Sequence, residues 1–260
     1  MKIIYYLFAL IIFVSLVQSV VAQSPELRVP ATHEAKEMVF SKDDKMMISL
    51  GESELRIWRT EGPYLLKTLP MPGSDTLYDT DLHILKDNSK LVINQNGRVR
   101  LLNLQTFEWE KSTWKIENPS TTGLSNDGKF LYYNTGTGNA GKILKLDLST
   151  GKSILVISFK SEEDASFGGK MSFNADESLL LGSSLIDYGG VLIDLKAKKI
   201  LYNFKQPQWP LFINEAGNVI VSSQVKVGDS DKDTYGTNRK YKVEEMDPRT
   251  QKVLRGIKSR

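Results

Sequence analysis

The chain has 260 residues, of which 40% are hydrophobic and 25% are charged, and this composition is typical of a globular protein with one large or two small domains. Lys and Arg (34) nearly balance Asp and Glu (31), and the charges are scattered singly, so we expect no nucleic-acid partner. The lack of cysteine excludes disulfides and thiolate chemistry, and two histidines, His33 and His83, are too few for a three-histidine metal site. No residue pattern indicates a cofactor.

The N-terminal segment has the pattern of a secretory signal peptide. It carries one positive charge, at Lys2, followed by an apolar run over Ile3–Val14 and by small and branched residues that end at Ala22. The alternative is an uncleaved membrane anchor, because about 20 residues of helix can cross a bilayer core, but three polar residues interrupt the second half of the segment (Ser15, Gln18 and Ser19). We therefore expect a signal peptide over residues 1–22, cleavage near Ala22, and an extracytoplasmic mature chain, periplasmic or secreted, with no other membrane contact.

The rest of the chain contains a repeated turn signature, in which an apolar residue precedes a short polar stretch and then a short apolar run. The five apolar anchors, which are 45, 39, 49 and 40 residues apart, are Phe40, Leu85, Leu124, Phe173 and Ile213. The polar stretches are rich in Asn, Asp, Gly and Ser, which accept left-handed backbone angles or hydrogen-bond their own main chain. Each copy therefore predicts a tight turn between two β-strands.

A second signature follows each first one and consists of an alternating strand that ends just before another turn. The five end residues, which are 45, 44, 47 and 53 residues apart, are Trp58, Asn103, Asp147, Asp194 and Asp247. Two signatures in the same order five times predict four short strands in about 45 residues, which is the period of a propeller blade. The expected fold class is therefore all-β, a propeller of about five four-stranded blades over residues 23–260. The expected repeats cover approximately residues 32–72, 73–115, 116–160, 161–205 and 206–258.

The same segments resemble the WD-repeat propellers. Val39–Lys45, together with Ile57–Trp58, is similar to the "AFSPDGK … LWD" pattern of that family, and Asp147–Lys152 is similar to its "D-x-x-T-G-K" turn. The resemblance covers nearly all of residues 32–257 and implies WD-like blades. No repeat has an intact Trp-Asp pair, and the Gly-His that begins the family's repeats is absent, so the resemblance does not extend to the hydrogen-bonded tetrad that ties the family's blades together.

The number of strands leaves open whether the ring is closed. Leu27–Val29 reads as a strand before the first repeat, and in the WD-repeat family such a strand completes the last blade, yet repeat five has its own outer strand at Lys252–Ile257. The sequence is consistent with a closed five-bladed ring, and equally with an incomplete propeller that belongs to a longer chain or is completed by another chain. An open end that leaves roughly 500 Å² of apolar blade face in water would cost about 12 kcal/mol. Self-association through an open blade edge is therefore one expected outcome.

Ligand contacts are expected at one rim of the central channel. In known propellers this rim is formed by the residues that lead into the first strand of each blade, which here are Lys36, Asp81, Ser120, Gly169 and Trp209. Such a chemically mixed set is better suited to binding a peptide or a small ligand than to catalysing a single reaction. The four that carry a side chain, all but Gly169, are the predicted ligand-binding residues, and Trp209 is equally suited to packing between blades.

Two groups of acidic residues are candidates for other chemistry. The three Asp residues that end the strands in repeats three to five could act in acid–base catalysis or bind a cation, but a carboxylate just before a tight turn normally accepts hydrogen bonds from the turn amides. Asp229, Asp231 and Asp233 offer alternating oxygen ligands of the kind that calcium uses, but their loop lacks the glycine and the final acid of an EF-hand. A solvated loop is the favoured interpretation, and we predict no metal site and no catalytic residue.

The sequence favours a non-catalytic scaffold that is exported and WD-like and that binds a protein or peptide partner. One alternative is an enzyme, a propeller-type hydrolase or lactonase, which would need several acids and histidines around the channel, whereas the rim set holds one acid, Asp81. The other alternative follows from the resemblance to exported WD-like propellers joined to caspase-like peptidase domains, and makes this chain the N-terminal sensor portion of a longer protein. The peptidase would then lie outside this chain, because the chain has no cysteine.

Overall fold

A computed structural model describes residues 35–62, 64–72, 80–117, 119–135, 141–159, 169–184, 189–205, 208–225 and 240–257. In these ranges the chain forms twenty β-strands in five four-stranded antiparallel sheets. None of the described residues belongs to a helix long and apolar enough to cross a membrane. The expected signal peptide, His33, the expected strand at Leu27–Val29, and Asp229, Asp231 and Asp233 lie outside the described residues.

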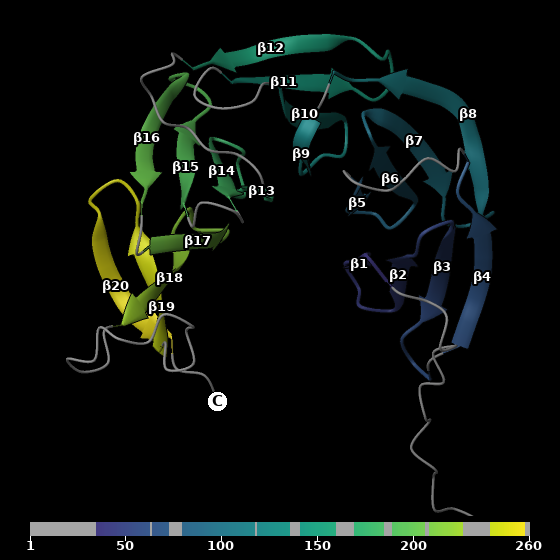
Figure 1. Ribbon diagram of the computed structural model, residues 1–260, viewed down its shortest axis with the longest axis horizontal. Helices are drawn as coiled ribbons and strands as arrows, with labels where there is room; N and C mark the ends of the chain where they lie inside the picture. The colour runs from purple at the N-terminus through teal and green to yellow at the C-terminus, as the bar shows by residue number, and fades with distance from the viewer. Residues whose placement is uncertain are drawn as a thin grey trace, which may run out of the picture. The chain divides into compact units, whose positions relative to one another are not determined.

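The strands of each sheet follow one another in chain order, as Figure 1 shows. Blade 1 contains β1 (Glu37–Phe40), β2 (Met46–Leu50), β3 (Glu54–Arg59) and β4 (Tyr64–Pro70). Blade 2 contains β5 (Thr80–Ile84), β6 (Lys90–Gln95), β7 (Arg98–Asn103) and β8 (Glu108–Lys115). Blade 3 contains β9 (Pro119–Leu124), β10 (Phe130–Thr135), β11 (Lys142–Asp147) and β12 (Ser153–Ser158). Blade 4 contains β13 (Met171–Phe173), β14 (Leu179–Ser184), β15 (Gly189–Asp194) and β16 (Lys199–Phe204), and blade 5 contains β17 (Gln208–Ile213), β18 (Val219–Val225), β19 (Lys240–Asp247) and β20 (Lys252–Ile257).

The chain divides into two compact units, residues 1–74 with blade 1 and residues 75–260 with blades 2 to 5. In the second unit the inner strands β5, β9, β13 and β17 follow one another as neighbours. The outer strands β8, β12, β16 and β20 lie on the outside of the array (Figure 1). Each sheet falls within one expected repeat, and the expected all-β fold with five four-stranded propeller blades is confirmed.

Successive blades of the second unit pack face to face through three apolar clusters. Between blades 2 and 3 the buried residues include Val92, Leu101, Leu131 and Leu146. The cluster between blades 3 and 4 includes Tyr132, Ile143, Leu180 and Ile193. The cluster between blades 4 and 5 includes Leu179, Leu192, Val219 and Met246. Each inner blade thus buries both of its faces, because alternate residues of a strand point to opposite sides of the sheet.

Both predicted turns of each blade contain one residue with a left-handed backbone. In the turn between the first and second strands these are Asp44, Asn88, Gly128, Glu177 and Gly217, with φ between 53° and 86°. In the turn between the third and fourth strands they are Gly62, Phe107, Gly151, Lys198 and Gln251, with φ between 50° and 72°. Glycine adopts this conformation without strain, and Asn and Asp tolerate it, so the turn composition explains most of these positions.

The structure corrects the alignment of the first turn signature in repeats two and five. Leu85 is the first residue of its turn rather than the last of the strand, and its side chain packs under Gly128 of blade 3, where an added Cβ would lie 2.7 Å from the Leu85 Cδ2 atom. In blade 5 the turn is one residue shorter, because the amide of Asn214 bonds to the carbonyl of Asn218, four residues later instead of five. Asn218 therefore takes the place that Leu179 has in blade 4.

Candidate functional site

The structure places the expected rim residues at the beginnings of the inner strands. Lys36 directly precedes β1, in the first unit, and its side chain lies 3.4 Å from Glu52. In the second unit Asp81, Ser120 and Trp209 are the second residues of β5, β9 and β17. They occupy equivalent positions in different blades.

Asp81 belongs to a hydrogen-bond network that joins blades 2 and 3. Its Oδ2 atom accepts a hydrogen bond from the Thr122 hydroxyl at 2.8 Å and one from the Asn94 amide at 3.4 Å. The Nε2 atom of His83 lies 2.7 Å from the same Thr122 hydroxyl. Thr122 and Asn94 are buried, so the network ties the inner strands β5 and β9 together. The sequence analysis did not identify Thr122, since a threonine within a strand carries no distinctive signal.

The protonation of His83 follows from this network. Thr122 donates its single proton to the Asp81 carboxylate, so the Nε2 atom of His83 must donate to the Thr122 oxygen. Burial lowers the pKa of His83 from 6.5 to about 4, and the positive charge of Lys170 contributes to the same direction. His83 is therefore neutral at pH 7 and acts as a hydrogen-bond donor between blades.

Replacing Thr122 with Val should lower the free energy of unfolding by about 1.5 kcal/mol, because the substitution keeps the shape but takes this partner from two half-buried polar groups, Asp81 and His83. Thr113→Val is the matched control, since Thr113 is exposed on the outer strand β8. Urea denaturation followed by tryptophan fluorescence measures both. Equal stability of the two variants would show that the network contributes nothing.

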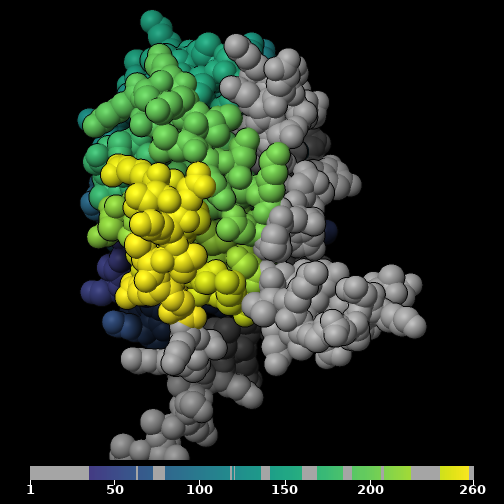
Figure 2. All heavy atoms as spheres, turned by 90° about the vertical axis from the view of Figure 1, so that its left-hand side faces the viewer, coloured from purple at the N-terminus to yellow at the C-terminus, as the bar shows by residue number. Residues whose placement is uncertain are grey.

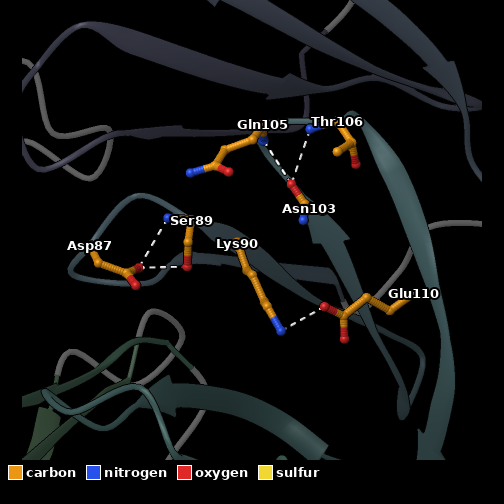
Figure 3. A network of polar contacts seen from close by, with 7 residues as sticks. All are labelled: Asp87, Ser89, Lys90, Asn103, Gln105, Thr106 and Glu110. Carbon is orange, nitrogen blue, oxygen red and sulfur yellow. Dashed lines mark hydrogen bonds and ion pairs between the residues drawn. The ribbon is translucent and has the colours of Figure 1, made fainter.

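The Asp and Asn residues in and before the turns accept hydrogen bonds from the turns themselves. In the first turn of blade 2, the Asp87 carboxylate accepts bonds from the amide and hydroxyl of Ser89 at 3.0 and 2.7 Å (Figure 3). In the second turn, Asn103 Oδ1 accepts bonds from the amides of Gln105 and Thr106 at 2.8 and 3.0 Å (Figure 3). The ion pair between Lys90 and Glu110, at 2.6 Å, joins β6 to β8 below these turns.

The three Asp residues that the sequence marks as candidates for acid–base chemistry have the same structural role. Asp147 accepts bonds from the amides of Ser149 and Thr150, Asp194 from the amide of Ala197, and Asp247 from the amide of Arg249. The hydrogen bonds from the side chain and amide of Ser149 lower the pKa of Asp147, and the bond from the Thr250 side chain lowers that of Asp247, because they favour the ionised carboxylate. Among the described residues no three His, Asp or Glu side chains come together as a metal site would require.

The face of blade 5 that points away from blade 4 has a different composition from the inner blade faces. The residues that strand pairing places on this terminal face include Trp209, Phe212, Ile220, Ser222, Tyr241, Val243, Glu245, Arg255 and Ile257. Three of them are large and exposed, with exposed fractions of 49% for Phe212, 53% for Tyr241 and 42% for Ile257. Trp209, the expected rim residue, lies on the same face and is half-buried.

A polar cluster around the buried side chain of Glu245 occupies the middle of the terminal face. Glu245 accepts hydrogen bonds from the side-chain amides of Asn214 and Asn218 at 2.9 and 2.8 Å, and Arg255 pairs with it at 2.6 Å. The bond from Asn218, and then that from Arg255, lowers the pKa of Glu245. In blade 4 the places of Asn218 and Glu245 are taken by Leu179 and Leu192, which pack against blade 5. Blade 5 thus replaces two core leucines with a satisfied polar pair.

No protein-family model matches the chain, and no curated protein matches it. Among solved structures, hydrazine synthase of Kuenenia stuttgartiensis is similar in fold, with a TM-score of 0.59 and 13% sequence identity. The match covers 83% of this chain and 64% of that chain, so this chain spans less than two thirds of its neighbour's length. At this identity the likeness concerns the fold alone.

Proposed function

We propose that the chain is an exported, WD-like propeller that acts as a non-catalytic scaffold and binds a protein or peptide partner on the terminal face of blade 5. The observation that carries the proposal is the exposure of Phe212, Tyr241 and Ile257 on the sheet face that also carries the anchored side chain of Arg255. Aromatic residues and arginine are the residue types that dominate binding energy in protein interfaces, and contiguous exposed apolar surface commonly marks such sites.

The chemistry of the face indicates the kind of partner. Glu245 fixes the Arg255 guanidinium, yet the Arg255 side chain remains 73% exposed and can meet a further carboxylate. Lys252 adds a positive charge on the same outer strand, β20 (within the yellow segment of Figure 2), whereas Lys242 lies on the opposite face of the sheet and pairs with Glu244. The face therefore fits a segment that brings apolar anchors together with acidic residues.

The alternative functions have less support. In the turns described above, the carboxylates accept hydrogen bonds from the turn residues, and His83 is bonded to Thr122, so these groups serve the fold. An assay of the mature protein against ester and lactone substrates, with and without added divalent metal, tests the hydrolase alternative. Export and signal cleavage are tested by mass spectrometry of the secreted protein, which should begin at Gln23.

The binding proposal predicts that Phe212→Ser and Tyr241→Ser each weaken binding at least tenfold. The probe is a library of random peptides displayed on phage and selected on the mature protein, followed by affinity measurement with the synthetic form of the selected peptides. Tyr64→Ser is the matched control, because Tyr64 is 66% exposed on β4 of blade 1.

Two results would contradict the proposal. Selected peptides that bind all three variants equally would place the site elsewhere. A large loss of stability in Phe212→Ser, measured by urea denaturation, would show that this face is covered in the free protein.

A further inference from the structure

The outer strand of blade 3, β12, differs from the other four outer strands. An outer strand has one free edge, and charged residues on such strands oppose pairing with another chain. The charged residues on the other outer strands are Lys67 in β4, Glu108, Glu110, Lys111 and Lys115 in β8, Lys199 in β16, and Lys252 and Arg255 in β20. Strand β12 reads Ser-Ile-Leu-Val-Ile-Ser over Ser153–Ser158 and contains no charge, proline or glycine.

Strand β12 also exposes two large apolar side chains at its edge. Ile154 and Leu155 are each 51% exposed. Val156 and Ile157 pack on the cluster between blades 3 and 4, so the strand is held against its blade. β12 is the outermost strand of this blade (Figure 1), and its outer main-chain edge is not paired within the sheet.

The sequence of β12 reads nearly the same in both directions. In an antiparallel pair of two copies centred between Leu155 and Val156, Ser153 lies opposite Ser158 and Ile154 opposite Ile157. The register shift at Val156 keeps the two members of each of these pairs on the same face of the sheet. Aliphatic and β-branched residues that face one another across strands stabilise a sheet, and no charge meets its own copy. A two-fold axis requires this kind of self-complementary surface.

We propose that β12 is a self-association site, at which the strand pairs antiparallel with β12 of a second copy of this chain. The pairing would join the two copies of blade 3 into one eight-stranded sheet, with main-chain hydrogen bonds across the axis. This inference concerns self-association and is independent of the partner proposed for blade 5.

The pairing is expected to be weak. Each of the five outer strands has a register shift against its neighbour, and in β12 it falls at Val156. Such a bulge bends the strand and shortens the regular edge. A pair of six-residue strands also buries less than the roughly 1,200 Å² of a standard interface. We therefore expect a dissociation constant on the order of 10–100 μM.

Sedimentation velocity of the mature protein over a concentration series tests the proposal. Leu155→Lys should raise the dissociation constant at least tenfold, because it places a charge beside the axis in both copies. Leu254→Lys is the matched control: Leu254 is 52% exposed on β20, which already carries charges, and its variant should dimerise like the unmodified protein. A protein that stays monomeric at 200 μM would overturn the proposal. So would a dimer whose dissociation constant changes equally in the two variants, or in neither of them.

A distance measurement provides a second test that needs no disruptive substitution. The chain has no cysteine, so Ser153→Cys gives a single site for a nitroxide spin label. In the proposed pair the two copies of residue 153 are five residues apart along the strand direction, which is about 18 Å between Cα atoms. Electron–electron double resonance on the concentrated protein should show a distance near this value, and its absence from the dimer would overturn the proposal.

Discussion

Between pH 7.5 and pH 5.0 the protein should lose about 2 kcal/mol of its free energy of unfolding through the titration of His83 alone. The imidazole has a pKa of about 4 in the folded protein and an ordinary value of 6.5 when exposed. At pH 5.0 the unfolded chain therefore binds a proton at this residue, while the folded chain does not. Because the unfolded state binds more protons, stability falls as the pH is lowered through this window.

His83→Gln should remove most of this pH dependence. Glutamine keeps an N–H group that can donate to the Thr122 oxygen, but it does not titrate. Urea denaturation curves at pH 7.5 and pH 5.0 give the two free energies. His33→Gln is the control, since His33 is the other histidine of the chain, and it should keep the loss of the unmodified protein. A loss of the same size in His83→Gln would assign the pH dependence to other groups.

Below pH 5 carboxylates add a second loss of stability, while the loss from His83 continues until the pH falls through its folded pKa of about 4. Turn hydrogen bonds lower the pKa values of several Asp residues below 3.8, namely Asp43, Asp87, Asp127, Asp147, Asp176 and Asp247. A carboxylate with a lowered pKa stabilises the folded state above its ordinary pKa, and this contribution disappears as the pH falls through the folded value. At pH 5.0 these carboxylates are still ionised in both the folded and the unfolded protein, so the difference in stability between pH 7.5 and pH 5.0 reports on His83 and not on them.

The parts of the fold that the sequence predicted are those that depend on local chemistry. The turns were found because Asp87, Asp147 and their equivalents bond to amides two or three residues away, within the same short segment. The repeated pattern also predicted the four strands of each blade. Successive side chains of a strand point to opposite faces of its sheet, and an apolar face needs an apolar neighbour.

The parts that the sequence did not predict depend on contacts between blades. Thr122 joins Asp81 to His83 only because β9 lies beside β5. Glu245 is stabilised inside its sheet because the turn of blade 5 is one residue shorter, which brings Asn218 to the position of a core leucine. Neither the neighbouring strand nor the length of the turn could be read from one sequence.

The close approach of neighbouring blades depends on two glycines that the sequence did not single out, Gly123 in β9 and Gly190 in β15. A Cβ atom added at Gly123 would lie 2.6 Å from the Cβ atom of Met171, on the inner strand of blade 4. One added at Gly190 would lie 2.6 Å from both the Gly182 carbonyl oxygen and the Cγ atom of Pro210, on the inner strand of blade 5. The neighbouring blade therefore has to move if either position carries a side chain.

Gly123→Ala and Gly190→Ala should each lower the free energy of unfolding by about 3 kcal/mol, which is the cost of forcing an extra group into a packed core. Gly256→Ala is the matched control, because Gly256 also lies in a strand and nothing lies within 4 Å of its added Cβ. Its stability should change by less than about 0.5 kcal/mol, or rise slightly, since alanine restricts the unfolded chain. Urea denaturation at pH 7.5 measures all three, and a loss below about 1 kcal/mol in the first two would mean that the blades yield easily at these contacts.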